Sequence, residues 1–120
     1  MESCIFCKIA RKEIPAKIVA ESSLALAFED LNPQAPLHVL VIPKEHLDSF
    51  MDLTELHSET ALAMLALAQK IVRLKNASET GARLAINYGP DAGQSVKHLH
   101  LHVLGKRTMA WPPWSAGSAE

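Results

Sequence analysis

The sequence predicts an α+β fold in which a mostly antiparallel sheet packs around one long helix. Several short apolar runs are bounded by turn-forming residues, which is typical of strands, and one longer segment repeats apolar residues at the three- and four-residue spacing of a helix. A chain of 120 residues without a repeat of fixed period suits a single domain. We expect this domain to span residues 1–114 and to be followed by a flexible tail at residues 115–120.

Five segments carry the strand pattern. Residues 18–20 form a short apolar stretch, and in residues 24–30 larger apolar side chains alternate with small ones. Residues 38–43, HVLVIP, are rich in β-branched side chains and end at a proline, as a buried strand does. Residues 83–88, RLAINY, and residues 98–105, HLHLHVLG, complete the sheet on either side of a turn-rich connection.

Two helices are predicted, a short one at residues 4–11 and a long one of about five turns that begins near Thr54. Acidic residues near the start of the long helix and basic residues near its end suit the helix dipole. Its apolar residues lie in two stripes, which either deep burial or a subunit interface would explain. The first stripe contains Leu56, Thr60, Ala63, Leu67, Ile71 and Leu74, and the second contains Leu62, Leu65 and Val72.

The composition excludes several classes of protein. Hydrophobic residues make up 48% of the chain and charged residues 21%, which is typical of a globular protein. The formal net charge is −1, and the basic residues are scattered, so we expect neither a nucleic-acid nor a membrane-surface partner. No targeting pattern or membrane-spanning stretch is visible, and we therefore expect a cytoplasmic protein.

The chain has two cysteines, Cys4 and Cys7, in a C-x-x-C spacing. In a reducing compartment this spacing favours a metal-binding pair or a redox pair over a structural disulfide. A single C-x-x-C supplies half of a zinc site.

Three histidines, His98, His100 and His102, alternate with apolar residues. On a strand, residues two apart face the same side, so the three imidazoles would form one row. Such a row suits either a transition-metal site or phosphoryl chemistry with one imidazole as the nucleophile. The small polar turn formed by Gly93, Gln94 and Ser95 directly upstream favours phosphoryl chemistry, because backbone N–H groups and a hydroxyl bind anions, whereas a metal would require carboxylates.

The middle histidine is best placed to attack phosphorus. An ordinary histidine pKa of about 6.5 leaves the ring mostly neutral at pH 7, with a nitrogen lone pair available. A backbone carbonyl that accepts from Nδ1–H would leave Nε2 as the nucleophile. A second imidazole, if cationic, would offset charge on the phosphate.

The chain resembles the histidine triad (HIT) family of nucleotide hydrolases and transferases, whose signature alternates three histidines with apolar residues and is matched by HLHLHVL. The segments CIFCKIARKEIPAKIV, LAFEDLNPQAPLHVLVIPKEH and GQSVKHLHLHVLG extend the resemblance over nearly the whole chain. KEIPAK, PQAPLH, the terminal WPP and Ser95 are similar to the Hint branch, which hydrolyses purine nucleoside phosphoramidates such as AMP joined to an amine. GPDAGQSVKH is also similar to the Fhit branch, which cleaves dinucleoside polyphosphates.

The resemblance implies a five-stranded sheet with one long helix and a short N-terminal helix, and a homodimer across which the sheet continues. It implies a hydrolase of AMP-type phosphoramidates that works through a covalent AMP–histidine intermediate, without an organic cofactor. A dinucleoside polyphosphate hydrolase is the competing enzyme. A non-catalytic nucleotide-binding protein, or a zinc-stabilised interaction protein, is the alternative outside catalysis.

The resemblance also implies roles for individual residues. His100 would be the nucleophile, His102 would contact the phosphate, and the main-chain carbonyl of His98 would orient His100. Asp30 would bind the ribose hydroxyls, since a carboxylate accepts from both. The remaining site residues would be His38 in the polar network, Ser95 at a phosphate oxygen and the leaving amine, Asn87, Gly93 and Gln94 on the phosphate side, Ile9, Phe28 and Leu40 around the base, and Trp111 in the partner's active site.

Some bacterial members of the family bind zinc, and the resemblance implies the same ligands here. They would be Cys4, Cys7, His46 and His98. A closed shell of two cysteines and two histidines is structural, because no position remains open for a substrate.

Overall fold

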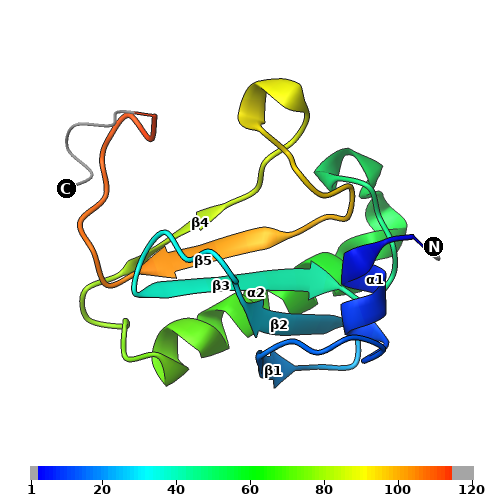
Figure 1. The fold of residues 1–120 in the computed structure, drawn as a ribbon, viewed down its shortest axis with the longest axis horizontal. Coiled ribbons are helices and arrows are strands. Elements are labelled where there is room, and N and C mark those ends of the chain that lie inside the picture. The colour runs from blue at the N-terminus through cyan, green and yellow to red at the C-terminus, as the bar shows by residue number, and fades with distance from the viewer. Residues whose placement is uncertain (1–2, 115–120) are drawn as a thin grey trace.

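The computed structural model describes residues 3–114, which form a five-stranded antiparallel sheet between one long and one short helix (Figure 1). The predicted tail, residues 115–120, lies outside the described residues. The α+β fold predicted from the sequence is confirmed. The elements are α1 (Ile5–Ala10), β1 (Ile18–Glu21), β2 (Ala25–Glu29), β3 (Leu37–Pro43), α2 (Ser58–Leu74), β4 (Ala82–Ala85) and β5 (Leu101–Gly105).

The strands are ordered β1-β2-β3-β5-β4, and every neighbouring pair is antiparallel. Strand β5 therefore inserts between β3 and β4, and β4 forms one edge of the sheet. In the β3–β5 register, Leu40 lies opposite His102 and His38 lies opposite Leu104. This register brings two histidines that are 64 residues apart in the chain onto neighbouring strands.

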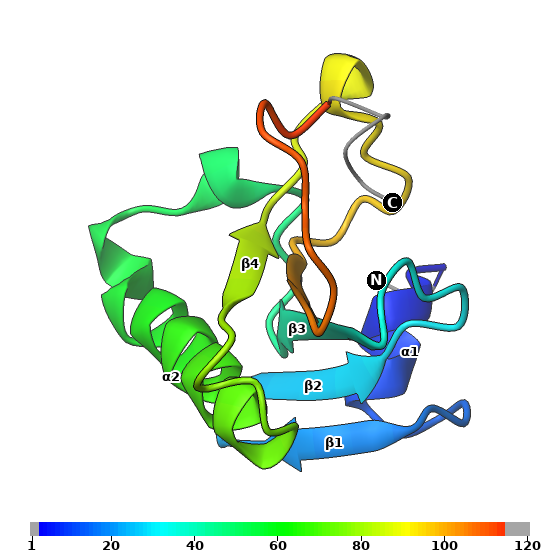
Figure 2. The ribbon, with the colours of Figure 1, turned by 90° about the vertical axis from the view of Figure 1, so that its left-hand side faces the viewer.

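Each face of the sheet has its own apolar core, and Figure 2 shows the two helices on opposite sides. Alternate residues of β2 and β3 point to opposite faces, so both strands are almost entirely buried. The core under α2 contains Ala25, Ala27, Val39, Val41, Leu67, Ile71, Leu101 and Val103 among others. The core under α1 contains Phe6, Ile9, Leu26, Phe28, Leu40 and Ile42.

The predicted strand at residues 98–105 is regular only from Leu101. The main-chain N–H of Leu99 donates to the carbonyl oxygen of Leu47 at 2.7 Å, so this stretch bonds to a loop rather than to β3. The alternation nevertheless continues, because Leu99 packs in the core under α2 and the rings of His98 and His100 contact Phe6 of α1. The three histidines share a face, as predicted, although only His102 lies in a strand.

The other predicted boundaries also shift. Strand β4 stops at Ala85, so the last three residues of RLAINY lie outside it. Directly after RLAINY, the main-chain N–H of Gly89 donates to the side chain of Gln94. The long helix begins at Ser58 rather than near Thr54, because Thr54 caps a separate 3₁₀ turn, Glu55–His57.

The two apolar stripes of α2 have different environments. Leu67 and Ile71 of the first stripe are buried against the sheet, but Leu56 at the start of that stripe is exposed. In the second stripe, Leu62 is 68% exposed and Leu65 is 52% exposed. Deep burial of both stripes is therefore wrong for this chain. Within residues 3–114, neither helix is long and apolar enough to cross a membrane.

Candidate active site and metal centre

A pocket of about 260 Å³ opens between α1 and the sheet. Its apolar walls come from α1, β2 and β3, whose alternate side chains face this side of the sheet. Its polar groups come from the ends of strands and from the loop before β5. The lining residues that matter for chemistry are His100, His102, Asp30 and Ser95, and the apolar ones include Ile5, Phe6, Ile9, Phe28, Leu40 and Val96.

His100 is held through one ring nitrogen by the main chain. Its Nδ1 lies 2.7 Å from the carbonyl oxygen of His98, and the side chain is buried. Because a carbonyl oxygen only accepts, Nδ1 must carry the hydrogen. In the neutral ring Nε2 is then left with its lone pair, which is the arrangement that a nucleophilic imidazole requires.

His102 offers the pocket a hydrogen-bond donor, whereas His100 offers a lone pair. The main-chain N–H of Gln34 donates to Nδ1 of His38 at 3.0 Å, so the hydrogen of a neutral His38 is on Nε2. That Nε2–H lies 2.9 Å from Nδ1 of His102 and donates to it. Nδ1 of His102 is thus an acceptor, and Nε2 of its neutral ring carries the hydrogen. The pocket is therefore supplied with a lone pair from His100 and an N–H donor from His102.

Burial favours the neutral forms of His102 and His38. The pKa of His102 is lowered from 6.5 to about 4, mainly by burial and in smaller part by the nearby rings of His100 and His38, whereas Asp30 opposes the shift. Burial also lowers the pKa of His38, against the attraction of the Asp30 carboxylate. His102 is therefore neutral at pH 7 and presents a hydrogen-bond donor to the pocket, whereas the sequence had left open a cationic imidazole.

Asp30 follows β2 and turns its carboxylate toward the same network. One oxygen accepts from the main-chain N–H of Asn32 at 2.8 Å, and the other lies 3.4 Å from Nε2 of His38. Asp30, His38 and His102 lie close enough together to be considered as metal ligands. The facing nitrogens of His38 and His102 share a hydrogen bond, so each ring positions the other.

The pocket does not include every residue expected on the phosphate side. Asn87, Gly93 and Gln94 are outside its lining. The side chain of Gln94 donates to the carbonyl oxygens of Asp48 and Val96 and accepts from Gly89 N–H, so it braces the loop that carries Ser95. Trp111 also lies outside this pocket; it is 78% exposed and stacks with Arg83 of its own chain.

Phe6 is a site residue that the sequence analysis missed. Its ring packs edge-on against His100, with centroids 5.2 Å apart, and also contacts His98 and Phe28. The available signal was its place inside C-I-F-C, on the buried side of a short helix. An aromatic edge at this distance restrains the His100 ring without competing for its nitrogen lone pair.

The second cluster contains Cys4, Cys7, His46 and His98, whose ligand atoms all lie within 4.8 Å of one another. The Sγ of Cys4 is 3.2 Å from Nδ1 of His98, and the Sγ of Cys7 is 3.2 Å from Nδ1 of His46. Two sulfurs and two imidazole nitrogens are a donor set that suits tetrahedral zinc. The four residues predicted as ligands are thus brought together.

The surroundings of the cluster prepare both histidines for a metal. Nε2–H of His46 donates to the Asp48 carboxylate at 2.7 Å, and Nε2–H of His98 donates to the Pro43 carbonyl oxygen at 2.9 Å. Both Nδ1 atoms therefore carry lone pairs directed toward the sulfurs, as metal ligands require. Burial, followed by the neighbouring Cys4, raises the pKa of the Cys7 thiol, which a bound cation would counteract.

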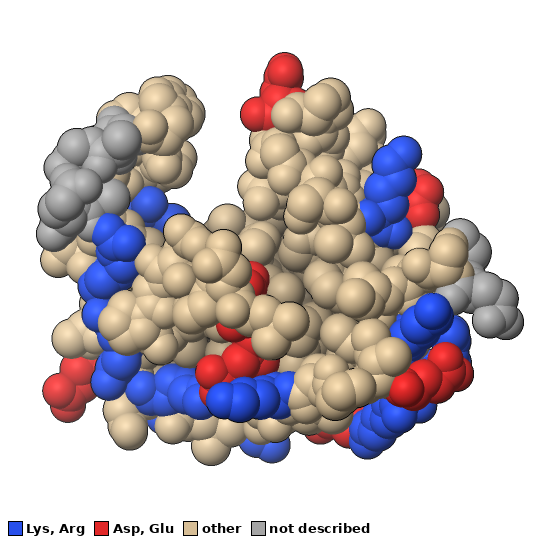
Figure 3. Space-filling view, viewed as in Figure 1, with Lys and Arg blue, Asp and Glu red and all other residues tan. Residues whose placement is uncertain are grey.

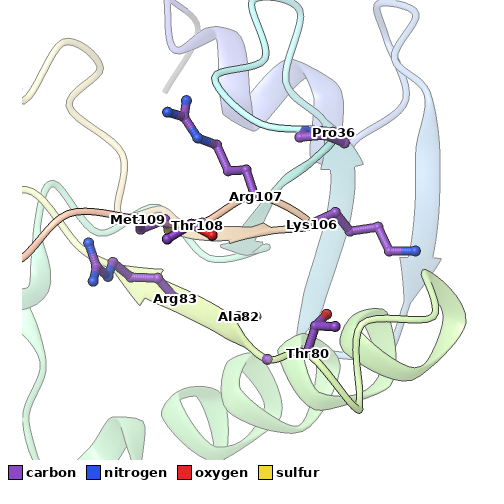
Figure 4. Close-up of a pocket in the computed structure, with 9 residues that line it drawn as sticks. Pro36, Thr80, Ala82, Arg83, Lys106, Arg107, Thr108 and Met109 are labelled. Carbon is purple, nitrogen blue, oxygen red and sulfur yellow. The ribbon is translucent and has the colours of Figure 1, made fainter. Parts of the chain in front are cut away.

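A larger hollow, of about 880 Å³, lies elsewhere, between the start of β4 and residues 106–109 (Figure 4). Arg83 and Arg107 line it, and both are already engaged, since they donate to the carbonyl oxygens of Ala110 and Gln34. None of the residues predicted for the site lines this hollow. On the face drawn in Figure 3, basic side chains lie along the left and lower margins, and acidic side chains lie beside them at the lower margin.

Comparison with known proteins identifies the family. The HIT domain model matches residues 11–109. The chain is 48% identical over 112 residues to an uncharacterized HIT-like protein of Synechococcus elongatus, covering 93% of this chain and 97% of the relative. It is 47% identical over 111 residues to a 14 kDa zinc-binding protein of Zea mays, covering 91% and 86%. The chain therefore belongs to the HIT domain family, and the resemblance inferred from the sequence is confirmed.

A solved structure supports the same assignment. A HIT family hydrolase from Legionella pneumophila matches with a TM-score of 0.89 and 47% sequence identity, covering 92% of this chain and 99% of that one. The shared fold includes the sheet and helices that position the two clusters described above.

The depressed pKa of His102 predicts a loss of stability in acid. The unfolded histidine takes up a proton below about pH 6.5, whereas the folded one does so only near pH 4. The free energy of unfolding is therefore highest above pH 6.5 and falls as the pH drops toward 4. His102 contributes roughly 1–3 kcal/mol to this loss, because solvent screens part of the charge on its partly buried ring. Urea unfolding of the wild type and His102→Gln across this range measures the effect. Parallel curves for the two proteins would contradict it.

Proposed function

We propose that this protein is a hydrolase that cleaves the P–N bond of purine nucleoside phosphoramidates, such as AMP joined to an amine. The observation that carries the proposal is the pairing of His100, whose Nε2 lone pair is free, with His102, whose Nε2–H is a donor, in one pocket. The Legionella relative is named a hydrolase, which supports the reaction class. The purine and the amine come from the similarity to the Hint branch.

The reaction proceeds by two in-line displacements. In the first, the lone pair of His100 Nε2 attacks phosphorus, the P–N bond breaks, and the amine leaves with a proton that Ser95 helps to deliver. In the second, water attacks phosphorus, the bond from phosphorus to His100 breaks, and AMP is released. In both steps the Nε2–H of His102 donates to a phosphate oxygen and stabilises its developing charge.

The rest of the pocket binds the nucleoside. Asp30 lies at the polar end and accepts hydrogen bonds from the ribose hydroxyls. Ile9, Phe28 and Leu40 enclose the base, together with Phe6. Zinc, when bound at the Cys4 cluster, supplies a structural link between α1 and the loop before β5.

We also propose that the chain forms a homodimer. Strand β4 is an edge of the sheet, and an edge strand has backbone N–H and C=O groups that can pair with another strand. Next to it, Leu65 and Val72 of α2 and Leu84 of β4 line an apolar hollow, and Leu62 is exposed nearby on α2. Pairing of β4 with the same strand of a second copy would continue the sheet and cover these side chains. Trp111 would then reach the partner's active site.

A single domain over residues 1–114 and a cytoplasmic location stay predictions.

Replacement of His100 by alanine is expected to lower kcat by at least about a thousandfold, because the nucleophile is lost. Mass spectrometry of rapidly quenched wild-type enzyme with an AMP phosphoramidate should find AMP attached to His100, and the variant should form no adduct. His57→Ala is the matched control, since His57 lies outside the pocket and should retain activity. An active His100→Ala enzyme would exclude His100 as the nucleophile.

The Hint-like substrate is expected to be preferred over the Fhit-like one. We expect kcat/KM for an alkyl or aminoacyl AMP phosphoramidate to exceed that for a diadenosine polyphosphate by at least about tenfold. Steady-state kinetics with both substrates on one preparation measures the ratio. The opposite order would favour the polyphosphate hydrolase, and tight AMP binding without turnover of either substrate would favour a binding protein.

The dimer is expected to dissociate when a charge is placed on its apolar face. Leu65→Glu would bury an unpaired carboxylate between the subunits, which is strongly unfavourable. Light scattering after size-exclusion chromatography should give the monomer mass for this variant and twice that mass for the wild type. The control is Lys70→Glu, which changes an exposed residue of the same helix outside the hollow. A monomeric wild type would refute the proposal.

A further inference from the structure

We infer that the cluster of Cys4, Cys7, His46 and His98 controls the catalytic histidine as well as the stability of the fold. Metal binding there would hold His98 in the position from which its carbonyl oxygen selects the reactive form of His100. In this view Cys4 and Cys7 are positioning residues for catalysis. The inference deepens the proposed function. Its predicted effect on kcat rests on that function, whereas its predicted effect on the His100 tautomer does not.

His98 belongs to both sites at once. Its side chain is completely buried; Nδ1 faces the two sulfurs, and Nε2 donates to the Pro43 carbonyl oxygen. Its own carbonyl oxygen accepts from Nδ1–H of His100. Only one residue separates the two histidines, and the N–H of this residue, Leu99, is bonded to Leu47. The backbone between the metal ligand and the nucleophile therefore has little freedom to absorb a movement of His98.

Helix α1 provides a second connection. Cys4 caps this helix and Cys7 lies within it, so two of the four ligands come from its first turns. A helix of six residues is too short to be stable by itself, and it depends on its tertiary anchors. Phe6, between the cysteines, contacts the rings of both His98 and His100, and Ile9 lines the substrate pocket. Loosening the cluster would therefore loosen one wall of the active site.

Without a cation the cluster is held only weakly. The contacts from sulfur to Nδ1 are 3.2 to 3.5 Å long, and thiols are poor hydrogen-bond donors. A metal held by Cys4, Cys7, His46 and His98 would replace these contacts with stronger bonds and would fix α1, the loop of His46 and the segment before β5 together. We expect metal removal to weaken the bond from His100 to the His98 carbonyl, so that the His100 ring samples both neutral tautomers.

The test measures the tautomer of His100 by NMR on protein labelled with ¹⁵N in its histidine rings. Reduced protein is studied with zinc, after chelation, and after zinc is restored, with zinc content determined by elemental analysis. The expected result is a single Nδ1–H form with zinc, a mixture without it, and recovery on restoration. Unchanged His100 ring signals in the folded, metal-free protein would overturn the inference, as would a failure to bind zinc.

A variant covers the case in which metal-free wild type unfolds. Asp48→Ala removes the carboxylate that orients His46 while leaving all four ligands in place, and the Asp48 side chain is 60% exposed. The loss of such an orienting group weakens metal binding by about 10–100-fold. At limiting zinc we expect kcat to fall by about tenfold or more with a smaller change in KM, and excess zinc should restore both kcat and the tautomer. A kcat that does not depend on zinc would overturn the inference.

A control separates positioning from general destabilisation. Ile71→Val shortens a buried side chain in the other core, under α2, and costs about 0.5–1.5 kcal/mol of stability. This variant should keep the wild-type tautomer and kcat at every zinc concentration. If Ile71→Val and Asp48→Ala both lose kcat in proportion to their loss of stability, the cluster acts only as a structural link and the inference is wrong.

The outcomes for the two proposals are distinguishable, because the tautomer is measured without substrate. A zinc-dependent tautomer in a protein that hydrolyses no phosphoramidate would refute the proposed function alone. Normal turnover, together with a His100 tautomer and a kcat that do not depend on zinc, would refute this inference alone.

Discussion

The hydrogen bond from Nδ1–H of His100 to the carbonyl oxygen of His98 is the interaction on which the candidate site depends. It joins two residues that are two positions apart, so it forms within the chain segment itself. It also determines the direction of the chemistry, since it leaves the His100 lone pair on Nε2. All other features of the pocket add to this arrangement by burying it, bracing it or providing the complementary donor.

The complementary donor depends on contacts between distant segments. The direction of the hydrogen bonds from Gln34 through His38 to His102 is set by the main-chain N–H of Gln34, which can only donate. The antiparallel pairing of β3 with β5 brings the two rings together, and burial keeps both neutral. A neutral histidine has one donor and one acceptor, and for this reason a single backbone group can orient the whole series.

The two faces of the sheet differ: one is covered by the core under α2, and the other carries the candidate site beside α1. Alternation along β2 and β3 sends one set of apolar residues to the core under α2 and the other to the core under α1. The long helix α2 covers the first face with a well-packed core. The short helix α1 covers only part of the second face, and the pocket opens where its cover ends. The same short helix carries Cys7 and is capped by Cys4, so a metal bound at the cluster would anchor it beside the site.

Features that depend on residues close together in the sequence could be predicted, whereas features that depend on contacts between distant segments could not. The alternation of LALAFED, the β-branched run HVLVIP, the period of the long helix and the shared face of the three histidines are local patterns, and the structure contains them. Local patterns did not reveal that Gln94 braces its loop, that Phe6 contacts the His100 ring, or that Leu62 and Leu65 of α2 are exposed. Each of these depends on which segments meet in space, and the strand order with β5 between β3 and β4 decides that.

The sequence by itself determined the chemical groups and their local spacing: three histidines at alternate positions, a C-x-x-C pair, and a carbonyl two residues before the middle imidazole. Apart from the local bond between His100 and the His98 carbonyl, the tertiary structure decided where the protons lie. The groups that orient them, Pro43 for His98, Asp48 for His46 and Gln34 for His38, act on rings whose partners come from other parts of the chain. A histidine's tautomer is set by what its second nitrogen contacts, and that contact exists only once the chain has folded.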